Sequence, residues 1–428
     1  MRHQRRVISL GLLAALAGAS LASAAGFGLF QHGGRAIGQV GAFTARAPEP
    51  SAIFYNPAAI THLEGAQLQA GLDFSNPSDE YSSATGNFSA QHIIQFPPHV
   101  YATWKPKGNP FALGIGLDSP SYYTENWLQA LFPGRFVNRR TELRLFELHP
   151  VLAYDLGEGW SVGGGARYLR GNFDVERNGI FQISPTSTAP FFDIEVERNA
   201  TAEVDAFAWD VAVHYAAPSW GWGAVYRSEV KLKGTGDVKY RPRDVPAVPG
   251  IDAALSARFG SGSARESFEI PGELAAGLWY APYPELRLEF DVSYQTWSSL
   301  ENNDITFDPN AFGDGPTVST PRDWKDTTAL RLGIEGDITD SLVLFGGIAS
   351  EPSPVPGSTL EPGFPRGDAM VYGAGFSYNF PQISFDMAYS FFDYDNRGAS
   401  NQELLNPSRT GSYSSREQRW GASVRWRF

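Results

Sequence analysis

The side chains that could do chemistry in this 428-residue sequence are not spaced for catalysis. Cysteine is absent, which excludes disulfides, thiolate nucleophiles and cysteine-ligated zinc. The seven histidines are scattered, and none stands with a serine or a carboxylate in a recognisable nucleophile or metal spacing. We therefore predict that the protein is not an enzyme and that it holds no cofactor and no metal.

Aromatic and aliphatic side chains are densest between residues 119 and 142. The members of this run are Tyr122, Tyr123, Trp127, Leu128, Leu131, Phe132 and Phe136. Their i, i+1, i+4, i+5 spacing predicts a short amphipathic helix. Because an apolar molecule gains about 0.8 kcal/mol for each CH2 that it buries, such a surface could capture one directly. The alternative is that these side chains pack the loop against its neighbour.

Strands must position these residues, because the chain after about residue 65 alternates apolar with polar or small residues. Leu288, Phe290 and Val292 share one face of such a segment, and Glu289 and Asp291 share the other. About fourteen segments alternate in this way, at 66–75, 99–105, 110–118, 143–155, 160–170, 203–217, 220–231, 266–281, 285–297, 326–338, 341–350, 369–380, 382–393 and 416–428. Alternation alone fits a soluble sandwich as well as a barrel.

The connections between the segments favour a barrel. Short turns at 157–159, 217–219, 282–284 and 339–340 alternate with long loops near 119–142, 171–202, 232–265, 298–325, 351–368 and 394–415. Outer-membrane barrels have this asymmetry between their two ends. The final alternating segment ends in Phe428, which resembles the signal that barrel-insertion machinery reads. We predict an all-β fold, an antiparallel transmembrane β-barrel of about fourteen strands over residues 66–428.

The N-terminus predicts export. Arg2, Arg5 and Arg6 precede an apolar stretch at 7–21, and 22–24 reads Ala-Ser-Ala, a cleavage pattern. We predict a signal peptide over residues 1–24, cleaved near Ala24, and a location in the bacterial outer membrane. The net charge of −12 disfavours nucleic acid as a partner.

Residues 25–65 are expected to fill the barrel. A lumen of about fourteen strands is too wide for the side chains of its own wall to fill. This segment is rich in glycine and alanine and contains Asn56-Pro57-Ala58. Its length fits a hatch folded back into the lumen, and the alternative is a flexible periplasmic tail.

Ordered motifs resemble a known family. Gly26-Phe27, Gly38 to Gly41 and the stretch 51–58 closely resemble the N-terminal hatch of the FadL-type outer-membrane transporters of long-chain fatty acids and hydrocarbons. The similarity continues at 114–116, 150–154, 324–327 and 353–356. The resemblance implies a monomeric barrel of fourteen strands, plugged by a hatch that includes Gly26, Phe27, Asn56, Pro57 and Ala58.

The sequence also departs from this family. Glu49 stands where the family usually has Asp, and Ala59 stands where Gly usually follows Asn-Pro-Ala. Many members have an Asp-x-x-Arg pattern where this chain reads Pro365-Arg366-Gly367-Asp368. These differences affect ligand contacts more than the fold.

The family implies a route for a hydrophobic small molecule. The ligand is first received at loop 119–142, Phe27 lines or blocks a second site, and movement of the hatch releases the ligand sideways into outer-membrane lipid where the third strand is kinked. The best match to that kink is Asp118-Ser119-Pro120, because proline lacks the N–H that a strand ladder needs. An ordinary strand end would explain this proline equally well.

The substrate class stays open between two hydrophobic ligands. We expect long-chain fatty acids, and the alternative is a monoaromatic or alkane hydrocarbon. A fatty-acid carboxylate would need a cation in the lumen. The arginines that project inwards by parity are Arg167, Arg227, Arg287 and Arg331. Most of them are expected to pair with lumen acids, and Arg167 and Arg331 are the candidates for contact with the ligand.

Overall fold

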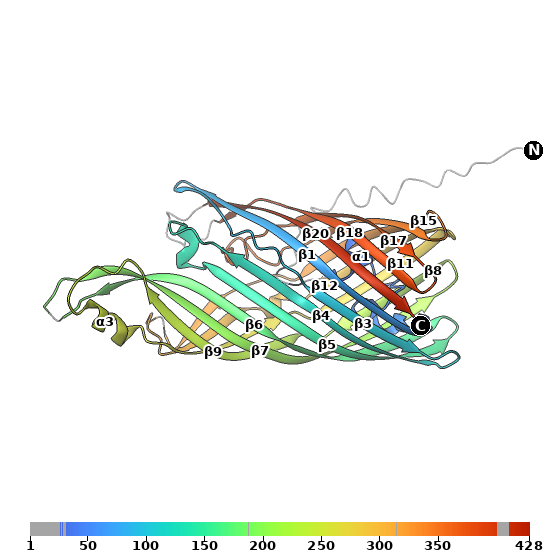
Figure 1. The fold of residues 1–428 in the computed structure, drawn as a ribbon, viewed down its shortest axis with the longest axis horizontal. Coiled ribbons are helices and arrows are strands. Elements are labelled where there is room, and N and C mark those ends of the chain that lie inside the picture. The colour runs from blue at the N-terminus through green and yellow to red at the C-terminus, as the bar shows by residue number, and fades with distance from the viewer. Residues whose placement is uncertain (1–25, 27, 29–30, 187, 314, 400–410) are drawn as a thin grey trace, which may run out of the picture.

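The computed structural model describes residues 26, 28, 31–186, 188–313, 315–399 and 411–428. The predicted signal peptide and Phe27 lie outside the described residues. The strands wrap into one closed antiparallel barrel, and they are steeply tilted to its long axis (Figure 1). The C-terminus lies at one end of the barrel, opposite the end from which helix α3 (Ile251–Arg258) projects.

Fourteen strands form the closed ring, as predicted. In order of pairing they are β1 (Gly65–Ser83), β3 (Pro98–Lys105), β4 (Phe111–Asn126), β5 (Arg140–Gly157), β6 (Trp160–Ile183), β7 (Phe192–Ala216), β8 (Trp220–Arg227), β11 (Glu273–Tyr283), β12 (Leu286–Gln295), β15 (Thr327–Asp337), β16 (Leu342–Glu351), β17 (Ala369–Asn379), β18 (Ile383–Tyr394) and β20 (Gly411–Arg427). The last strand pairs with the first, from Gln67 opposite Arg427 to Ser83 opposite Gly411, and so closes the barrel.

The burial of the strands is inverted relative to a soluble protein. In β18, Ser384, Asp386 and Ser390 face the lumen and are buried. Phe385 and Met387, from the same strand, are 44% and 54% exposed. A soluble sandwich would bury the apolar face and expose the polar face. The wall therefore presents its apolar face to lipid.

The sheet continues beyond the ring. This extension of the same sheet is built from β9 (Val230–Pro242), β10 (Gly262–Ile270), β13 (Asn302–Asp308) and β14 (Thr317–Pro321), and β9 pairs with the first half of β7. The expectation that 232–265 and 298–325 are loops was therefore wrong. The predicted strand 266–281 is divided at Pro271-Gly272, where proline cannot donate to the ladder.

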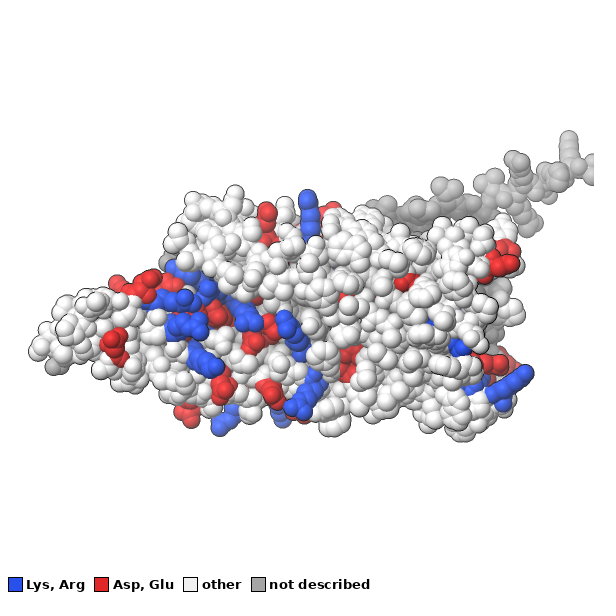
Figure 2. Space-filling model, viewed as in Figure 1, with Lys and Arg blue, Asp and Glu red and all other residues white. Residues whose placement is uncertain are grey.

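Charged side chains mark where this extension leaves the apolar part of the wall. In Figure 2 they gather over β6, β7 and β9, while much of the remaining barrel surface is uncharged. Exposed pairs such as Arg170 with Glu203 and Lys231 with Glu269 belong to this zone. Just beyond them along β7, Phe207 and Trp209 are exposed aromatics of the kind that form membrane-interface girdles.

Two short strands, β2 (Gly86–Ser89) and β19 (Arg397–Ala399), complete the loop end. No helix among the described residues is long and apolar enough to cross a membrane.

Candidate functional site

The N-terminal segment lies inside the barrel, which confirms the predicted hatch. Its helices are α1 (Gly34–Gly38), α2 (Ala52–Tyr55) and the 3-10 helix η1 (Pro57–His62), and nearly all of their residues are buried. Asn56 begins η1, because its side chain accepts a hydrogen bond from the Ala58 N–H at 3.1 Å. The Asn56 amide also donates to the Thr44 carbonyl at 3.0 Å. The Asn56-Pro57-Ala58 motif therefore stabilises the fold of the hatch itself.

Two carboxylates of β12 hold the hatch backbone. Asp291 accepts from the N–H groups of Phe43 and Thr44 at 2.9 and 2.8 Å. Glu289 accepts from the N–H groups of Ala45 and Arg46 at 2.7 and 3.0 Å. Residues 43–46 lie between α1 and α2, so their backbone N–H groups have no helical partners. Each carboxylate satisfies two of these donors.

A buried ion-pair cluster adds a second anchor. Glu335 of β15 pairs with Arg35 and Arg46 of the hatch, at 2.5 and 2.9 Å, and with Arg287 of β12 at 2.8 Å. Burial alone would lower the pKa of Arg35, but Glu335, Glu49 and Asp386 together raise it above its usual value. Arg35 is therefore held as a cation against the wall.

Glycines of the wall strands make room for the hatch. A Cβ on Gly163 of β6 would lie 2.8 Å from the Ala58 nitrogen, and one on Gly223 of β8 would lie 2.4 Å from the Asn56 amide nitrogen. Real Cβ atoms essentially never come this close to another atom. The hatch and the lumen therefore fit each other in shape as well as in charge.

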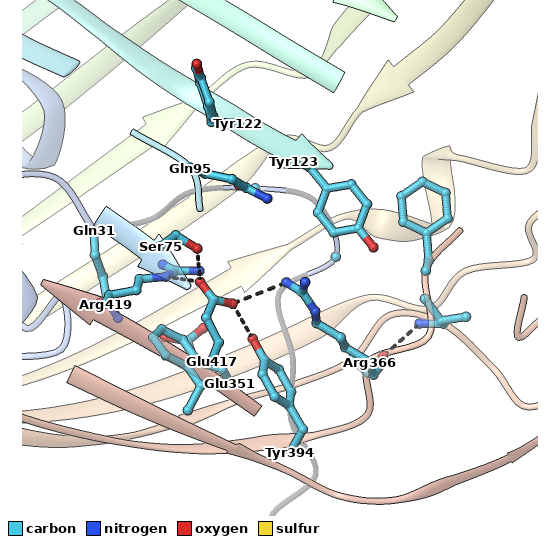
Figure 3. Close-up of a pocket in the computed structure, with 16 residues that line it drawn as sticks. Gln31, Ser75, Gln95, Tyr122, Tyr123, Glu351, Arg366, Tyr394, Glu417 and Arg419 are labelled. Carbon is cyan, nitrogen blue, oxygen red and sulfur yellow. Dashed lines mark hydrogen bonds and ion pairs between the residues drawn. The ribbon is translucent and has the colours of Figure 1, made fainter. Parts of the chain in front are cut away.

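A cavity lies between the start of the hatch and the loops, and we call it the upper cavity. Glu417 of β20 is its hub (Figure 3): Arg366 lies 3.2 Å away, the Tyr394 hydroxyl donates to it at 2.9 Å, and Arg419 pairs with it. Arg366 also pairs with Asp79 at 3.0 Å. Its guanidinium therefore ties the 351–368 loop to the wall.

A second cavity, which we call the wall cavity, lies beside β4. Its apolar lining comes from Phe54, Pro120, Leu169, Val230, Ile270 and Trp297. Arg167 and Arg227 also line it. Arg167 forms a two-point ion pair with Glu147, through Nε at 2.9 Å and Nη2 at 2.7 Å. Arg227 pairs with Glu273 and donates to the hatch carbonyls of Phe54 and Tyr55.

The candidate lateral opening lies at an irregularity of the wall. The ladder between β4 and β5 shifts register between Asp118 and Ser121, on either side of Ser119 and Pro120. β4 is the third strand of the ring, and β3 pairs with it only as far as Leu117. Pro120 also lines the wall cavity. The kink and the cavity therefore adjoin.

The aromatic run at 119–142 does not form the expected helix. Tyr122 and Tyr123 lie on β4, and the loop contains only the 3-10 helix η2 (Pro133–Phe136). Trp127 stacks on Phe132 at 4.6 Å between ring centroids, and both are fully buried. Tyr123 donates to the Gly363 carbonyl at 2.8 Å, and Trp127 donates to the Pro362 carbonyl at 2.9 Å. The helix prediction was wrong because these rings pack against loop 351–368, which lies far away in sequence.

Two residues of that run remain at the surface. Leu128 and Leu131 are 50% and 79% exposed. Leu131 borders an open groove of about 1060 Å³, which Phe136, Ile180 and Phe312 also line. Ile180 and Phe312 were missed by sequence reasoning because they come from β6 and from the loop after β13. We call this feature the outer groove.

The remaining candidates fall in different places. Gly26 lines the upper cavity. Arg331 pairs with Glu351 at 2.9 Å and lines neither the upper nor the wall cavity. Arg366 and Glu417 were missed as site residues, although the departure at 365–368 was a signal. Three side chains with metal-ligating atoms, His32, Asp73 and His99, lie together outside these cavities.

Comparison with known proteins assigns the family. The family model described as "Outer membrane protein transport protein (OMPP1/FadL/TodX)" matches residues 15–428. The long-chain fatty acid transport protein of Escherichia coli O6:H1 (strain CFT073) is 24% identical over 389 residues, which cover 84% of this chain and 83% of that protein. The 47 kDa outer membrane protein of Pasteurella multocida (strain Pm70) is also 24% identical, over 88% of this chain and 89% of its own.

Solved structures agree on the fold. A FadL homologue of Pseudomonas aeruginosa superposes with a TM-score of 0.82 at 18% identity, over 94% of this chain and all of that chain. The toluene transporter TodX of P. putida superposes with a TM-score of 0.71 at 14% identity, over 94% of this chain and 99% of its own. The hatch-plugged barrel and the full-length match together show that this chain belongs to the OMPP1/FadL/TodX family, whose members transport hydrophobic molecules across the outer membrane.

Proposed function

We propose that the protein takes up long-chain fatty acids. In this proposal the ligand is captured in the outer groove, passes through the upper cavity to the wall cavity, and leaves sideways into the outer membrane after the hatch moves. The wall cavity is the observation that carries the proposal, since it places two guanidinium groups beside an apolar lining. The name of the E. coli relative supports the same substrate class.

Capture requires only exposed apolar surface. Leu131, Phe136, Ile180 and Phe312 border the outer groove from two different loops and a strand. Each CH2 buried there contributes about 0.8 kcal/mol, so an acyl chain is retained without an ion pair. Leu128, which is 50% exposed on the same loop as Leu131, stays a prediction as a further contact.

Recognition of the headgroup is assigned to Arg167 and Arg227. The pair with Glu147 uses Nε and Nη2 of Arg167, which leaves Nη1 for a second acceptor. Arg227 already donates to hatch carbonyls. A carboxylate that replaced those carbonyls would be a stronger acceptor, so its arrival favours release of the hatch from the wall. Phe27 and Arg331 stay predictions as further ligand contacts.

Exit is assigned to Asp118, Ser119 and Pro120. A shifted register removes ladder hydrogen bonds locally, and proline supplies no donor there. The ladder between β4 and β5 is therefore interrupted where the wall adjoins the wall cavity. We also propose that the protein works as a monomer and that β20, together with Phe428 after it, is recognised by the barrel-insertion machinery.

A neutral hydrocarbon is the second candidate. It is favoured by the pairing of Arg167, Arg227 and Arg366 with carboxylates, because such pairs leave the cavities without a strong excess of positive charge. The fold is shared with the P. putida toluene transporter TodX, which supports the same candidate substrate.

Uptake of labelled oleate and labelled toluene, by cells with and without the gene, distinguishes the candidates. We expect the gene to increase oleate uptake and Arg167→Gln to reduce it several-fold. Arg241→Gln is the control, because Arg241 lies at the exposed rim, where it pairs with Glu197. An increase for toluene alone would favour the hydrocarbon, and no increase for either ligand would contradict hydrophobic uptake.

A further inference from the structure

We propose that His32, Asp73 and His99 form a binding site for a divalent transition-metal ion of the zinc class. His32 belongs to the hatch, Asp73 to β1 and His99 to β3, so the site spans the seam between hatch and wall. The ligand atoms of the three side chains all lie within 4.8 Å of one another. Both histidines are fully buried, and Asp73 is only 3% exposed.

The two separations from Asp73 to the histidines are longer than good hydrogen bonds and close to those of two ligands on one ion. Asp73 Oδ2 lies 3.4 Å from His99 Nδ1 and 3.7 Å from His32 Nδ1. Good N–H···O bonds span about 2.7–3.2 Å. Two ligand atoms that each lie 2.0–2.2 Å from one tetrahedral ion are separated by about 3.3–3.6 Å. The 3.4 Å separation falls within this range, and the 3.7 Å separation lies just outside it.

Four polar atoms around this space are unsatisfied, while Asp73 Oδ2 accepts a long hydrogen bond of 3.4 Å from the Gly33 N–H. Within the described part of the chain, both ring nitrogens of His32, Nδ1 of His99 and Oδ1 of Asp73 have no hydrogen-bond partner. Buried polar atoms without partners are costly, and native proteins contain few of them. A cation at this place would satisfy the nitrogen lone pairs and the carboxylate together.

The surroundings orient the ligands. His99 Nε2 lies 3.3 Å from the Ser423 hydroxyl of β20. A proton on Nε2 directed to this oxygen leaves the Nδ1 lone pair for the metal, which is the usual second contact of a metal-bound histidine. Gly71, opposite His99 in the ladder, makes space for the ring, because a Cβ there would lie 2.3 Å from His99 Nε2.

The donor set defines the class of ion. Two imidazole nitrogens and one carboxylate oxygen suit Zn²⁺ and neighbouring first-row ions, and they leave one position for water. Phe54 contacts His32 edge to face at 4.6 Å, and Tyr101 stacks near His99 at 5.9 Å, which keeps bulk water away. Because one ligand comes from the hatch and two come from the wall, bound metal would hold the hatch in its closed position.

Metal titration of the purified full-length protein tests the site. After removal of metal with EDTA, Zn²⁺ is titrated by calorimetry and Co²⁺ by visible absorption. We expect one equivalent of either ion to bind with the absorption of tetrahedral cobalt. Asp73→Asn and His32→Gln should each weaken its affinity at least tenfold. Since His32 lies in the hatch, its substitution leaves the barrel strands intact, and folding is verified by heat-modifiable gel mobility.

Two histidine variants serve as controls. His92 is exposed, so His92→Gln should still bind one equivalent of metal ion with unchanged affinity. His214→Gln removes another close histidine pair, in which His214 Nδ1 lies 3.1 Å from His62 Nε2. This variant should also bind one equivalent of metal ion. If wild-type protein binds neither ion, if His32→Gln binds as tightly as wild type, or if His214→Gln alone abolishes binding, the proposed site is refuted.

Discussion

Charges inside this barrel are shared between hatch and wall. Glu335 illustrates the arrangement, because it receives Arg35 and Arg46 from the hatch and Arg287 from β12. Buried charges are costly to leave unpaired, so removing one partner costs more than the pair itself contributes. Closure of the pore therefore depends on individual carboxylates.

Glu335→Gln is expected to loosen the hatch. The substitution leaves the buried Arg35 and the partly buried Arg46 without their carboxylate partner, and loss of one partner of a buried pair costs about 3–5 kcal/mol. We expect a lower midpoint of thermal unfolding and a higher single-channel conductance in planar bilayers. Asp337→Asn is the control, since Asp337 pairs with Arg287 and is 38% exposed, and its substitution should cost less than about 1 kcal/mol. Equal conductance of wild type and Glu335→Gln would contradict this role.

A single exposed leucine should matter for capture and not for stability. Leu131 is 79% exposed at the outer groove, so Leu131→Ser removes apolar contact surface without leaving a cavity. We expect the KM for oleate uptake to rise several-fold while thermal unfolding is unchanged. A change in unfolding with no change in KM would show that Leu131 packs the loop instead.

Elements contribute through shape. Strands β6 and β8 place glycine opposite the hatch, and loops 119–142 and 351–368 meet through Trp127 and its neighbours. In both cases a strand or loop is shaped for a partner that is distant in sequence. Substitutions at such positions test the fit between elements.

Gly163→Ala is expected to displace the hatch. The added Cβ would lie 2.8 Å from the Ala58 nitrogen, and overpacking of this kind costs about 1–3 kcal/mol. The natural chain has no cysteine, so Ser51→Cys supplies a single buried reporter in the hatch. Maleimide should label it faster in the Gly163→Ala background. Gly357→Ala is the matched control, because a Cβ there meets nothing within 4 Å. Equal labelling rates in the two backgrounds would argue against a tight fit.

Trp127→Ala is expected to detach loop 119–142 from loop 351–368. The ring is fully buried, stacks on Phe132 and donates to the Pro362 carbonyl, so truncation should cost about 3–5 kcal/mol. Protease sensitivity of the loop in intact cells measures the effect. Leu128→Ala, at an exposed position of the same loop, should leave the cleavage rate unchanged. A resistant loop in Trp127→Ala would contradict the anchoring role.

The whole molecule is a closed barrel whose lumen contains its own N-terminal hatch. Deletion of residues 25–60 should convert it into an open pore with increased small-solute conductance. Because the hatch takes Arg35 and Arg46 with it, Glu289, Asp291 and Glu335 lose partners and should make the pore prefer cations. The reversal potential in a KCl gradient measures this preference. Unchanged conductance would show that the hatch does not block the lumen.

Local pattern was enough to predict the ring. The fourteen alternating segments each overlap a ring strand, because a wall with lipid on one side and polar lumen on the other imposes a two-residue period on every strand. Parity also placed Arg167 and Arg227 inwards. The strands beyond the ring were missed, and the residues of β10 were merged with those of β11 across Pro271.

Only the tertiary structure decided which residues meet. Parity cannot show that Arg167 pairs with Glu147, that Trp127 reaches Pro362, or that His32 approaches Asp73 and His99. Those contacts depend on how far each strand is staggered against the next and on how the hatch folds back. Stagger accumulates around the closed ring and is a property of the whole barrel, whereas alternation belongs to each strand separately. The sequence by itself therefore determined the barrel, and closure of the barrel around the hatch determined the site.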